Sequence, residues 1–312
     1  MSKRIILLDS SGVLHRCFHG YKTPRLGYHE GNQLNVAALY GYLHYVRILS
    51  GEMFYDELIH VFDPDGGSAK RFEMYPQYKA NRSPTDPALV VQKPFLQPLL
   101  EAFGHTCLRI DGVESDDVIA TLSKKYAERG DDVLVVSTDK DLMQLVKDGS
   151  VVFSRYAQGS GDRKTHEFYE EEHVVQKMGV RPDQIADYLA LVGDDVDNIP
   201  GVFGLGEKTA VKLLQEYGSL SAIMTNADKI PGKMGANVRA ALEQLPLYRS
   251  LTTVFTDVEV DIPTSRPPVD SVKNAWAREM LTIPHYWPND LDGDLRDYSE
   301  SDTPIASSSL KM

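Results

Sequence analysis

With 312 residues, the chain can bury the core of one large domain or two modest ones, and 42% hydrophobic with 25% charged residues is an ordinary globular composition. No stretch approaches the roughly 20 apolar residues that a membrane span needs, so we expect no membrane partner. The net charge of -12 argues, taken as a sum, against nucleic acid, but a partner responds to where charges lie, and the stretch "KRFEMYPQYKANR" is basic.

The chain opens with the run "RIILLD" at residues 4–9. Its apolar part is too short for the core of a signal peptide, so we interpret it as a first β-strand. The two cysteines, Cys17 and Cys107, provide neither a disulfide framework nor a zinc pattern. A reducing cytoplasm is therefore the expected setting.

Short β-branched runs alternate with longer amphipathic segments through the first half of the chain. This alternation predicts βαβ units, and hence an α/β fold with a mostly parallel sheet flanked by helices, over residues 1–165. The predicted strands are 4–9, 57–63, 106–111, 132–139 and 150–154, and the predicted helices are 35–50, 87–104 and 115–130.

The strand signal disappears from about residue 165, and helical segments punctuated by Gly and Pro follow. We therefore predict an α-helical subdomain at residues 166–262. The sequence "IPTSRPPVDS" then marks a linker-like break, and the remainder is poorly periodic. Residues 263–312 are expected to form a partly disordered C-terminal extension, with an acidic stretch at 289–302.

Acidic residues follow the predicted strands. In an open parallel sheet, ligands bind beyond the carboxyl ends of the strands, so these side chains should meet at one edge, joined by acids from "GDDVDN" in the helical half. A single Asp is most often a turn residue or a helix N-cap, but like charges gathered on one edge require a compensating cation. The predicted metal-binding set is Asp9, Asp63, Glu114, Asp116, Asp117, Asp139, Asp141, Asp194 and Asp197.

The type and number of these ligands indicate the kind of site. Carboxylate oxygens without His or Cys suit a hard divalent ion, Mg²⁺ or Mn²⁺. So many carboxylates exceed what one ion needs, which favours a two-metal site of the kind that cleaves phosphodiesters. No nucleophile motif competes, because "DSSG" is not a G-x-S-x-G elbow and the histidines lack H-E-x-x-H spacing. "GVFGLGEKT" is not a Walker A loop, because Glu207 separates Gly206 from Lys208.

Five segments, in order, resemble a known family: the 5′-nuclease domain of bacterial DNA polymerase I and its stand-alone flap-endonuclease relatives. The similarity covers about residues 4–260. It implies a helical arch near 70–100 and a helix–hairpin–helix (H3TH-type) DNA-binding element at 185–217. The segments are "LLDSSGVLHRCFHG", "VFDPDGGSAKRFEMYPQYKANR", "GVESDDVIATL", "STDKDLMQLV" and "GDDVDNIPGVFGLGEKTAVKLLQEYGSL".

The resemblance also implies roles for single residues. Two Mg²⁺ (or Mn²⁺) would be bound by two groups of acids: Asp9, Asp63, Glu114 and Asp116 in one, and Asp139, Asp141, Asp194 and Asp197 in the other, with Asp117 beside both. The implied catalytic cations are Lys79 and Arg82 of the arch and Arg16 of the first segment. Tyr78 would either stack on a DNA base or pack within the arch. The implied duplex contacts are Gly201, Gly204, Gly206, Lys208 and Thr209, where relatives often bind K⁺.

The resulting expectation is a monomeric, stand-alone 5′→3′ exonuclease and flap endonuclease of DNA replication or repair. It would act on 5′ flaps, nicked or branched duplex and 5′ ends, and would leave 5′-phosphate and 3′-hydroxyl products. Two alternatives stay open. A phosphatase or small ribonuclease with clustered acids would not explain the "YKANR" segment or the glycine-rich hairpin. A non-catalytic DNA-binding module would have no electrostatic reason to keep the acids.

Overall fold

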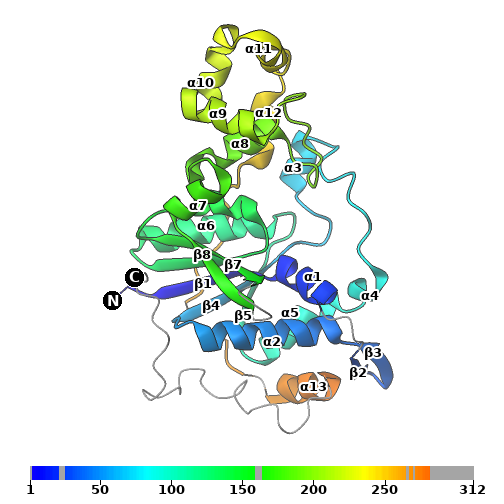
Figure 1. Ribbon diagram of the computed structural model, residues 1–312. Helices are drawn as coiled ribbons and strands as arrows, with labels where there is room; N and C mark the ends of the chain where they lie inside the picture. The colour runs from blue at the N-terminus through cyan, green and yellow to red at the C-terminus, as the bar shows by residue number, and fades with distance from the viewer. Residues whose placement is uncertain (1, 21–24, 159–163, 265–266, 270, 282–312) are drawn as a thin grey trace.

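The computed structural model describes residues 2–20, 25–158, 164–264, 267–269 and 271–281. Its centre is a six-stranded sheet in the order β5-β4-β1-β6-β7-β8 (Figure 1). The strands from β5 to β7 in that order run parallel, and β8 is antiparallel to β7. Their bounds are β1 (Arg4–Asp9), β4 (Glu57–Phe62), β5 (Thr106–Arg109), β6 (Asp132–Val136), β7 (Val151–Gln158) and β8 (Lys164–Tyr169).

Both faces of the sheet are buried, as expected for parallel strands. In β1, Ile6 and Leu8 contribute to a core with α1 (Ser10–Gly20), α2 (Ala37–Glu52) and α5 (Lys93–Ala102). The alternate residues Ile5 and Leu7 face the second core, which contains α6 (Ser115–Glu128) and continues into the helical half. The predicted fold class, a mostly parallel sheet flanked by helices and followed by a helical part, is confirmed.

The sequence analysis did not predict helix α1, the hairpin of β2 (Leu26–His29) and β3 (Asn32–Asn35), strand β8 or helix α13 (Ser271–Leu281). Strand β8 extends the sheet by pairing with β7, and α13 packs against β2 and α5. The strands are short, and α13 depends on partners distant in sequence, which a local pattern does not reveal. The acidic stretch at 289–302 lies outside the described residues.

The segment expected to be a helical arch is helical only at its two ends. Helix α3 (Ala69–Met74) begins it and α4 (Pro87–Val90) ends it, with turns and extended chain between them. Figure 1 shows this segment running from α3, beside the helical half, down to α4 near α1. Helix α5 follows and packs into the core rather than forming part of the arch, with Leu96, Leu99 and Leu100 buried.

The helical half contains the expected helix–hairpin–helix geometry. Helix α8 (Ile185–Val192) and helix α9 (Glu207–Tyr217) contact each other and are joined by the loop at 193–206. Around them lie α7 (Glu171–Met178), η2 (Pro182–Gln184), α10 (Leu220–Thr225), η3 (Ala227–Lys229), α11 (Gly232–Ala240) and α12 (Leu245–Thr252). Within the residues that the structure describes, no helix is both long and apolar enough to cross a membrane.

Candidate active site

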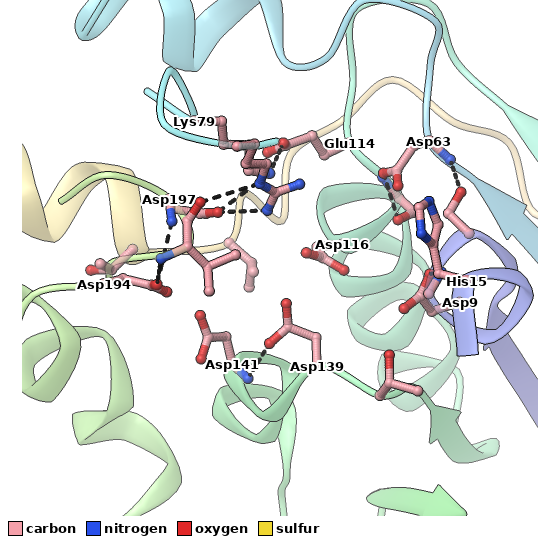
Figure 2. A pocket seen from close by; sticks show the side chains of 18 of the residues that line it. Asp9, His15, Asp63, Lys79, Glu114, Asp116, Asp139, Asp141, Asp194 and Asp197 are labelled. Carbon is pink, nitrogen blue, oxygen red and sulfur yellow. Dashed lines mark hydrogen bonds and ion pairs between the residues drawn. The ribbon is translucent and has the colours of Figure 1, made fainter. Parts of the chain in front are cut away.

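A cleft of about 1050 Å³ opens at the carboxyl end of the parallel strands. It brings together every acid of the predicted metal-binding set except Asp117. Figure 2 shows the labelled acids arranged around one open space. The acids that line it are Asp9, Asp63, Glu114, Asp116, Asp139, Asp141, Asp194 and Asp197.

Neighbouring donors hold the strand-end acids in place. Asp9 ends β1 and accepts hydrogen bonds from the Gly12 N–H at 3.0 Å and the Ser137 hydroxyl at 2.7 Å. Asp63 follows β4, and its Oδ1 accepts from the Ser115 N–H at 3.0 Å and the Ser115 hydroxyl at 2.8 Å. The sequence analysis missed these donors, although each is a small residue inside one of the acidic segments.

The second group of acids comes from two turns. Asp139 caps the 3₁₀ helix η1 (Lys140–Leu145), where its carboxylate accepts from the Asp141 N–H at 2.9 Å. Asp194 begins the hairpin loop and accepts from the Val196 and Asp197 N–H groups at 2.8 and 3.3 Å. These backbone bonds fix the turns and leave other carboxylate oxygens directed at the cleft.

The electrostatics of the cleft favour a bound cation. Burial, together with the charge of Asp63, raises the pKa of Asp9 to about 7. Burial and neighbouring carboxylates also raise the pKa of Asp116, Asp139 and Asp141. Asp141 Oδ1 is buried without a hydrogen-bond partner. Divalent cations would remove this repulsion and satisfy that oxygen, so the oxygen-only donor set fits Mg²⁺ or Mn²⁺.

The acids do not form a preformed set of metal ligands. Among the described residues, no three His, Cys, Asp or Glu side chains are arranged closely enough to hold an ion by themselves.

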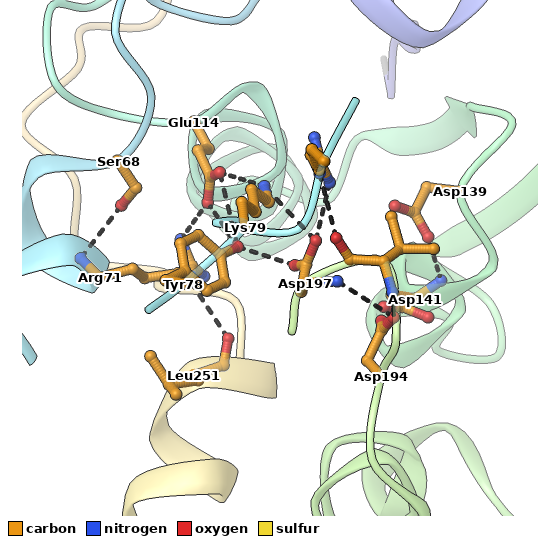
Figure 3. Close-up of polar contacts among 12 residues, drawn as sticks. Ser68, Arg71, Tyr78, Lys79, Glu114, Asp139, Asp141, Asp194, Asp197 and Leu251 are labelled. Atoms are coloured by element: carbon orange, nitrogen blue, oxygen red, sulfur yellow. Dashed lines mark hydrogen bonds and ion pairs between the residues drawn. The ribbon is translucent and has the colours of Figure 1, made fainter. Parts of the chain in front are cut away.

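The predicted catalytic cations Lys79 and Arg82 lie against these acids. Figure 3 shows Lys79 beside Glu114 and Asp197. Lys79 Nζ forms an ion pair with Glu114, and Arg82 Nη2 lies 2.7 Å from Asp197 Oδ1. Lys79 has φ 57° and lies in a turn rather than on a helix, and its N–H donates to the Asp197 carbonyl at 3.0 Å. The arch segment is thus closed onto the loop that begins the hairpin.

Tyr78 does not offer a surface to a DNA base. The residue is 2% exposed, and its ring packs in a small cluster with Ile199 and Leu251. Its hydroxyl donates to Asp197 Oδ2 at 2.8 Å and to Glu114 Oε2 at 3.2 Å. The stacking role is therefore wrong for this arrangement, and the alternative reading, packing within the arch, is the one observed.

Asp117 is also placed differently from the prediction. It is 2% exposed, does not line the cleft, and pairs with Arg71 through both of its oxygens, at 2.6 and 2.8 Å. Its Oδ1 also accepts from the Phe255 N–H at 2.8 Å. An acid in the first turn of a helix can face either side of that turn, and here Asp117 faces the buried Arg71 rather than the cleft.

Further nitrogen-bearing side chains line the cleft. Arg16, His15 and His19 of α1 line it together with Arg155 of β7. Partial burial is the main cause that lowers the pKa of His15. The sequence analysis identified Arg16 but missed Arg155, which carries no motif and becomes visible only when β7 is placed beside β6.

The predicted duplex contacts lie beyond the cleft, on the hairpin and α9. Gly201 has φ 65°, and an added Cβ would lie 2.4 Å from the Gly193 nitrogen. Gly206 is the N-cap of α9, whose first turn carries Lys208 and Thr209. Gly204 also has a left-handed backbone, with φ 70°. A bridge between Asp194 and Ile199 connects this hairpin to the cleft.

Known proteins resemble the chain along most of its length. The model "5'-3' exonuclease, N-terminal resolvase-like domain" matches residues 4–179, and "5'-3' exonuclease, C-terminal SAM fold" matches residues 180–275. A "5'-3' exonuclease" of Aquifex aeolicus is 38% identical over 224 residues, 72% of this chain and 73% of the relative. "DNA polymerase I, thermostable" of Thermus aquaticus is 37% identical over 230 residues, 72% of this chain but 25% of the polymerase.

Among solved structures, the T5 5'-exonuclease with bound zinc is similar at a TM-score of 0.65 and 25% identity, covering 80% of this chain and 89% of that one. The catalytic core of Rad2 in complex with DNA substrate has a TM-score of 0.56 at 16% identity, and the similarity covers 93% of this chain and 90% of that one. The second likeness concerns the fold alone.

Proposed function

Because the chain belongs to the 5'-3' exonuclease family, we propose that it is a structure-specific 5′-nuclease that removes nucleotides from 5′ ends and cuts 5′ flaps of DNA. The observation that carries this proposal is the cleft of converging acids at the sheet edge, joined directly to a helix–hairpin–helix. Nicked or branched duplex would be further substrates. The setting would be DNA replication or repair in the cytoplasm, with the protein acting as a monomer.

The acids would hold two divalent cations, Mg²⁺ or Mn²⁺, in two groups. When bound, such ions supply a nucleophile from water at neutral pH and stabilise charge on the attacking and leaving oxygens. Cleavage of this kind would leave 5′-phosphate and 3′-hydroxyl ends. One group is Asp9, Asp63, Glu114 and Asp116, and the other is Asp139, Asp141, Asp194 and Asp197.

The cations of the cleft would act on the DNA itself. Lys79 and Arg82 now pair with Glu114 and Asp197, and both side chains are long enough to turn to a nearby phosphate when ions neutralise these acids. There they would stabilise the charge that develops during cleavage. Arg16, which also lines the cleft, would contact a phosphate of the same strand.

The hairpin would hold the duplex away from the cut. The N-terminus of α9 has no side-chain cap and carries Lys208 and Thr209 in its first turn, so it would form a suitable site for backbone phosphates. The left-handed glycines at 201 and 204 let the loop carbonyls and N–H groups turn toward the DNA, where a K⁺ ion could bridge them to phosphate. Binding the duplex here would determine which phosphate reaches the acids.

One gel tests the proposal against its alternatives. A flap duplex labelled at its 5′ end is incubated with the protein in Mg²⁺ or in EDTA, beside an RNA flap and a free phosphomonoester. We expect released 5′ fragments from the DNA in Mg²⁺ only. Hydrolysis of the monoester alone would identify a phosphatase, selective cutting of RNA a ribonuclease, and binding without cleavage a DNA-binding module.

A further inference from the structure

Arg71 of α3 lies at the wall of the cleft, but it has no donor left for DNA. It is 3% exposed, and its five N–H donors are all used. The Nε group donates to the Leu251 carbonyl at 3.1 Å. The Nη1 group donates to Glu114 at 2.7 Å and Asp117 at 2.6 Å. The Nη2 group donates to Asp117 at 2.8 Å and to the Thr253 carbonyl at 3.0 Å.

The two carbonyls that Arg71 binds belong to one stretch of backbone, residues 251–255, which we call the strap. The strap begins in the last residues of α12, and its residues Leu251, Thr252 and Val254 line the cleft. The ring of Phe255, at its far end, lies 4.7 Å from the Arg71 guanidinium carbon. Arg71 therefore connects the arch segment, the acid Glu114 and the strap in a single buried set of bonds.

A second residue holds the strap from the other group of acids. Gln144 of η1 donates to the Thr252 carbonyl at 3.2 Å and accepts from the Val254 N–H at 3.1 Å. The same side chain donates to the Asp141 carbonyl at 2.9 Å. Each group of acids thus has one neighbour that binds both the group and the strap: Arg71 for Glu114, and Gln144 for Asp141.

The strap is anchored at its other end in the helical half. Thr252 donates through its hydroxyl to the Ala186 carbonyl at 2.9 Å, and Arg249 Nε donates to Asp187 Oδ1 at 2.6 Å. Ala186 and Asp187 lie in α8, the first helix of the helix–hairpin–helix. A displacement of α8 on binding a duplex would therefore reach both groups of acids through the strap.

We propose that Arg71 and Gln144 are positioning residues, which link the duplex-binding helices to the two groups of acids and set the spacing between them. This inference rests on the proposed function, since it explains how a bound duplex promotes cleavage at the same site. Charged hydrogen bonds in a buried setting are strong and directional, which suits them to hold such a spacing. Neither residue needs to touch the scissile phosphate.

The test compares Arg71→Lys and Gln144→Ala with the wild type. Lysine keeps the charge of Arg71 but cannot reach all of its partners, and alanine removes both strap bonds of Gln144. Lys125→Ala is the matched control, because Lys125 Nζ also holds the chain just beyond the strap, at the Val260 carbonyl 2.5 Å away, without contacting a cleft acid. Circular dichroism identifies the variants that fold. If Arg71→Lys does not fold, Gln144→Ala alone tests the proposal.

Two readouts separate positioning from a purely structural role. The first is the single-turnover rate on flaps whose downstream duplex either reaches the hairpin or is trimmed short of it. The second is Mn²⁺ affinity, measured by electron paramagnetic resonance without DNA. We expect the rate on the long duplex to fall about tenfold or more in Arg71→Lys and Gln144→Ala. In both variants, the ratio of the rate on the long duplex to the rate on the short duplex should decrease, and the affinity for Mn²⁺ should fall. Lys125→Ala should resemble the wild type in both readouts.

Two results would overturn the inference: folded variants that keep the wild-type rates and Mn²⁺ affinity, or a Lys125→Ala protein that loses as much as the other two. A wild type that cleaves neither flap would instead refute the proposed function. The two failures are therefore distinguishable in the same experiment.

Discussion

The carboxylate of Asp9 accepts two hydrogen bonds while burial and Asp63 oppose its charge. The fold therefore holds this acid in position at an energetic cost that a cation would relieve. Lys79 and Arg82 relieve part of the same repulsion on the other side of the cleft, through Glu114 and Asp197. At the scale of single residues, the cleft is a set of fixed negative charges that a bound cation would stabilise.

The raised pKa of Asp9, about 7, predicts a pH-dependent effect of metal. An unfolded Asp loses its proton near pH 3.9, so between about pH 4 and 7 the folded chain retains a proton that the unfolded chain releases. The contribution of Asp9 to stability without metal therefore decreases as the pH rises through this window. Because Mg²⁺ needs the ionised form, it should raise the melting temperature more at pH 8 than at pH 5.5.

Melting curves with and without Mg²⁺ at these two pH values check this prediction. Asp9→Asn should reduce the difference between them. A melting shift that is equal at the two pH values, or larger at pH 5.5, would contradict it.

Lys79→Ala tests the proposed role of the arch cation. Loss of one donor that stabilises developing charge costs about a hundredfold or more in rate, whereas duplex affinity should change little. Single-turnover rates and fluorescence anisotropy measure the two quantities. Lys124→Ala is the control, since Lys124 is exposed on α6 and does not line the cleft. Equal losses of rate in both variants would remove the special role of Lys79.

At the scale of elements, the hairpin between α8 and α9 depends on a close approach of two backbone segments. Gly201 has φ 65°, and a Cβ there would lie 2.5 Å from the Val192 carbonyl carbon. The atoms nearest to this Cβ belong to the backbone, which cannot move aside as a flexible side chain could. Only glycine therefore allows the hairpin to close onto the end of α8.

We accordingly predict that Gly201→Ala destabilises the protein by about 1 kcal/mol or more and weakens duplex binding. Gly51→Ala, near the end of α2, is the matched control, because its backbone is not left-handed and an added Cβ meets nothing within 4 Å. Chemical denaturation and anisotropy with a duplex measure the two effects. A Gly201→Ala protein as stable and as tightly bound as Gly51→Ala would contradict the proposed need for glycine at position 201.

The sequence predicted elements with a strong apolar pattern and missed elements that a neighbouring element stabilises. Strand β1 has a continuous apolar run and α6 buries Val118, Ile119 and Leu122, whereas β8 belongs to the sheet because it pairs with β7. The same holds for side chains. The cleft acids follow from strand ends, but Asp117 and Tyr78 were assigned to metal and DNA although Arg71 and Ile199 bury them. Local pattern cannot tell which side of a turn a polar residue faces.

At the scale of the whole molecule, the proposed function requires a chain of net charge -12 to bind DNA, which is itself strongly negative. Long-range repulsion from the acidic surface is screened at physiological salt within about 8 Å, so local cations determine binding. The hairpin and α9 are proposed to supply such cations, distant from the carboxylates of the cleft. Bound divalent ions would reverse the sign of the cleft as well.

The salt dependence of duplex binding tests this distribution of charge. Lys208→Ala should lower the slope of log Kd against log salt by about one, as expected for the loss of one phosphate contact. Lys147→Ala makes the same change in net charge at an exposed turn before β7, at the other edge of the sheet from the cleft. Equal slopes for these two variants would indicate that Lys208 does not contact the duplex.

The central claim is that the acids of the cleft are required for DNA cleavage, whereas DNA binding depends on other parts of the molecule. The most direct measurement is the single-turnover cleavage of a 5′ flap by Asp141→Asn, with DNA affinity measured on the same sample. Asp195→Asn is the control, since Asp195 is exposed in the same loop as Asp194 and does not line the cleft. We predict that Asp141→Asn loses at least about a hundredfold in rate while it still binds DNA, and that Asp195→Asn loses neither. Undiminished cleavage by Asp141→Asn would contradict the account.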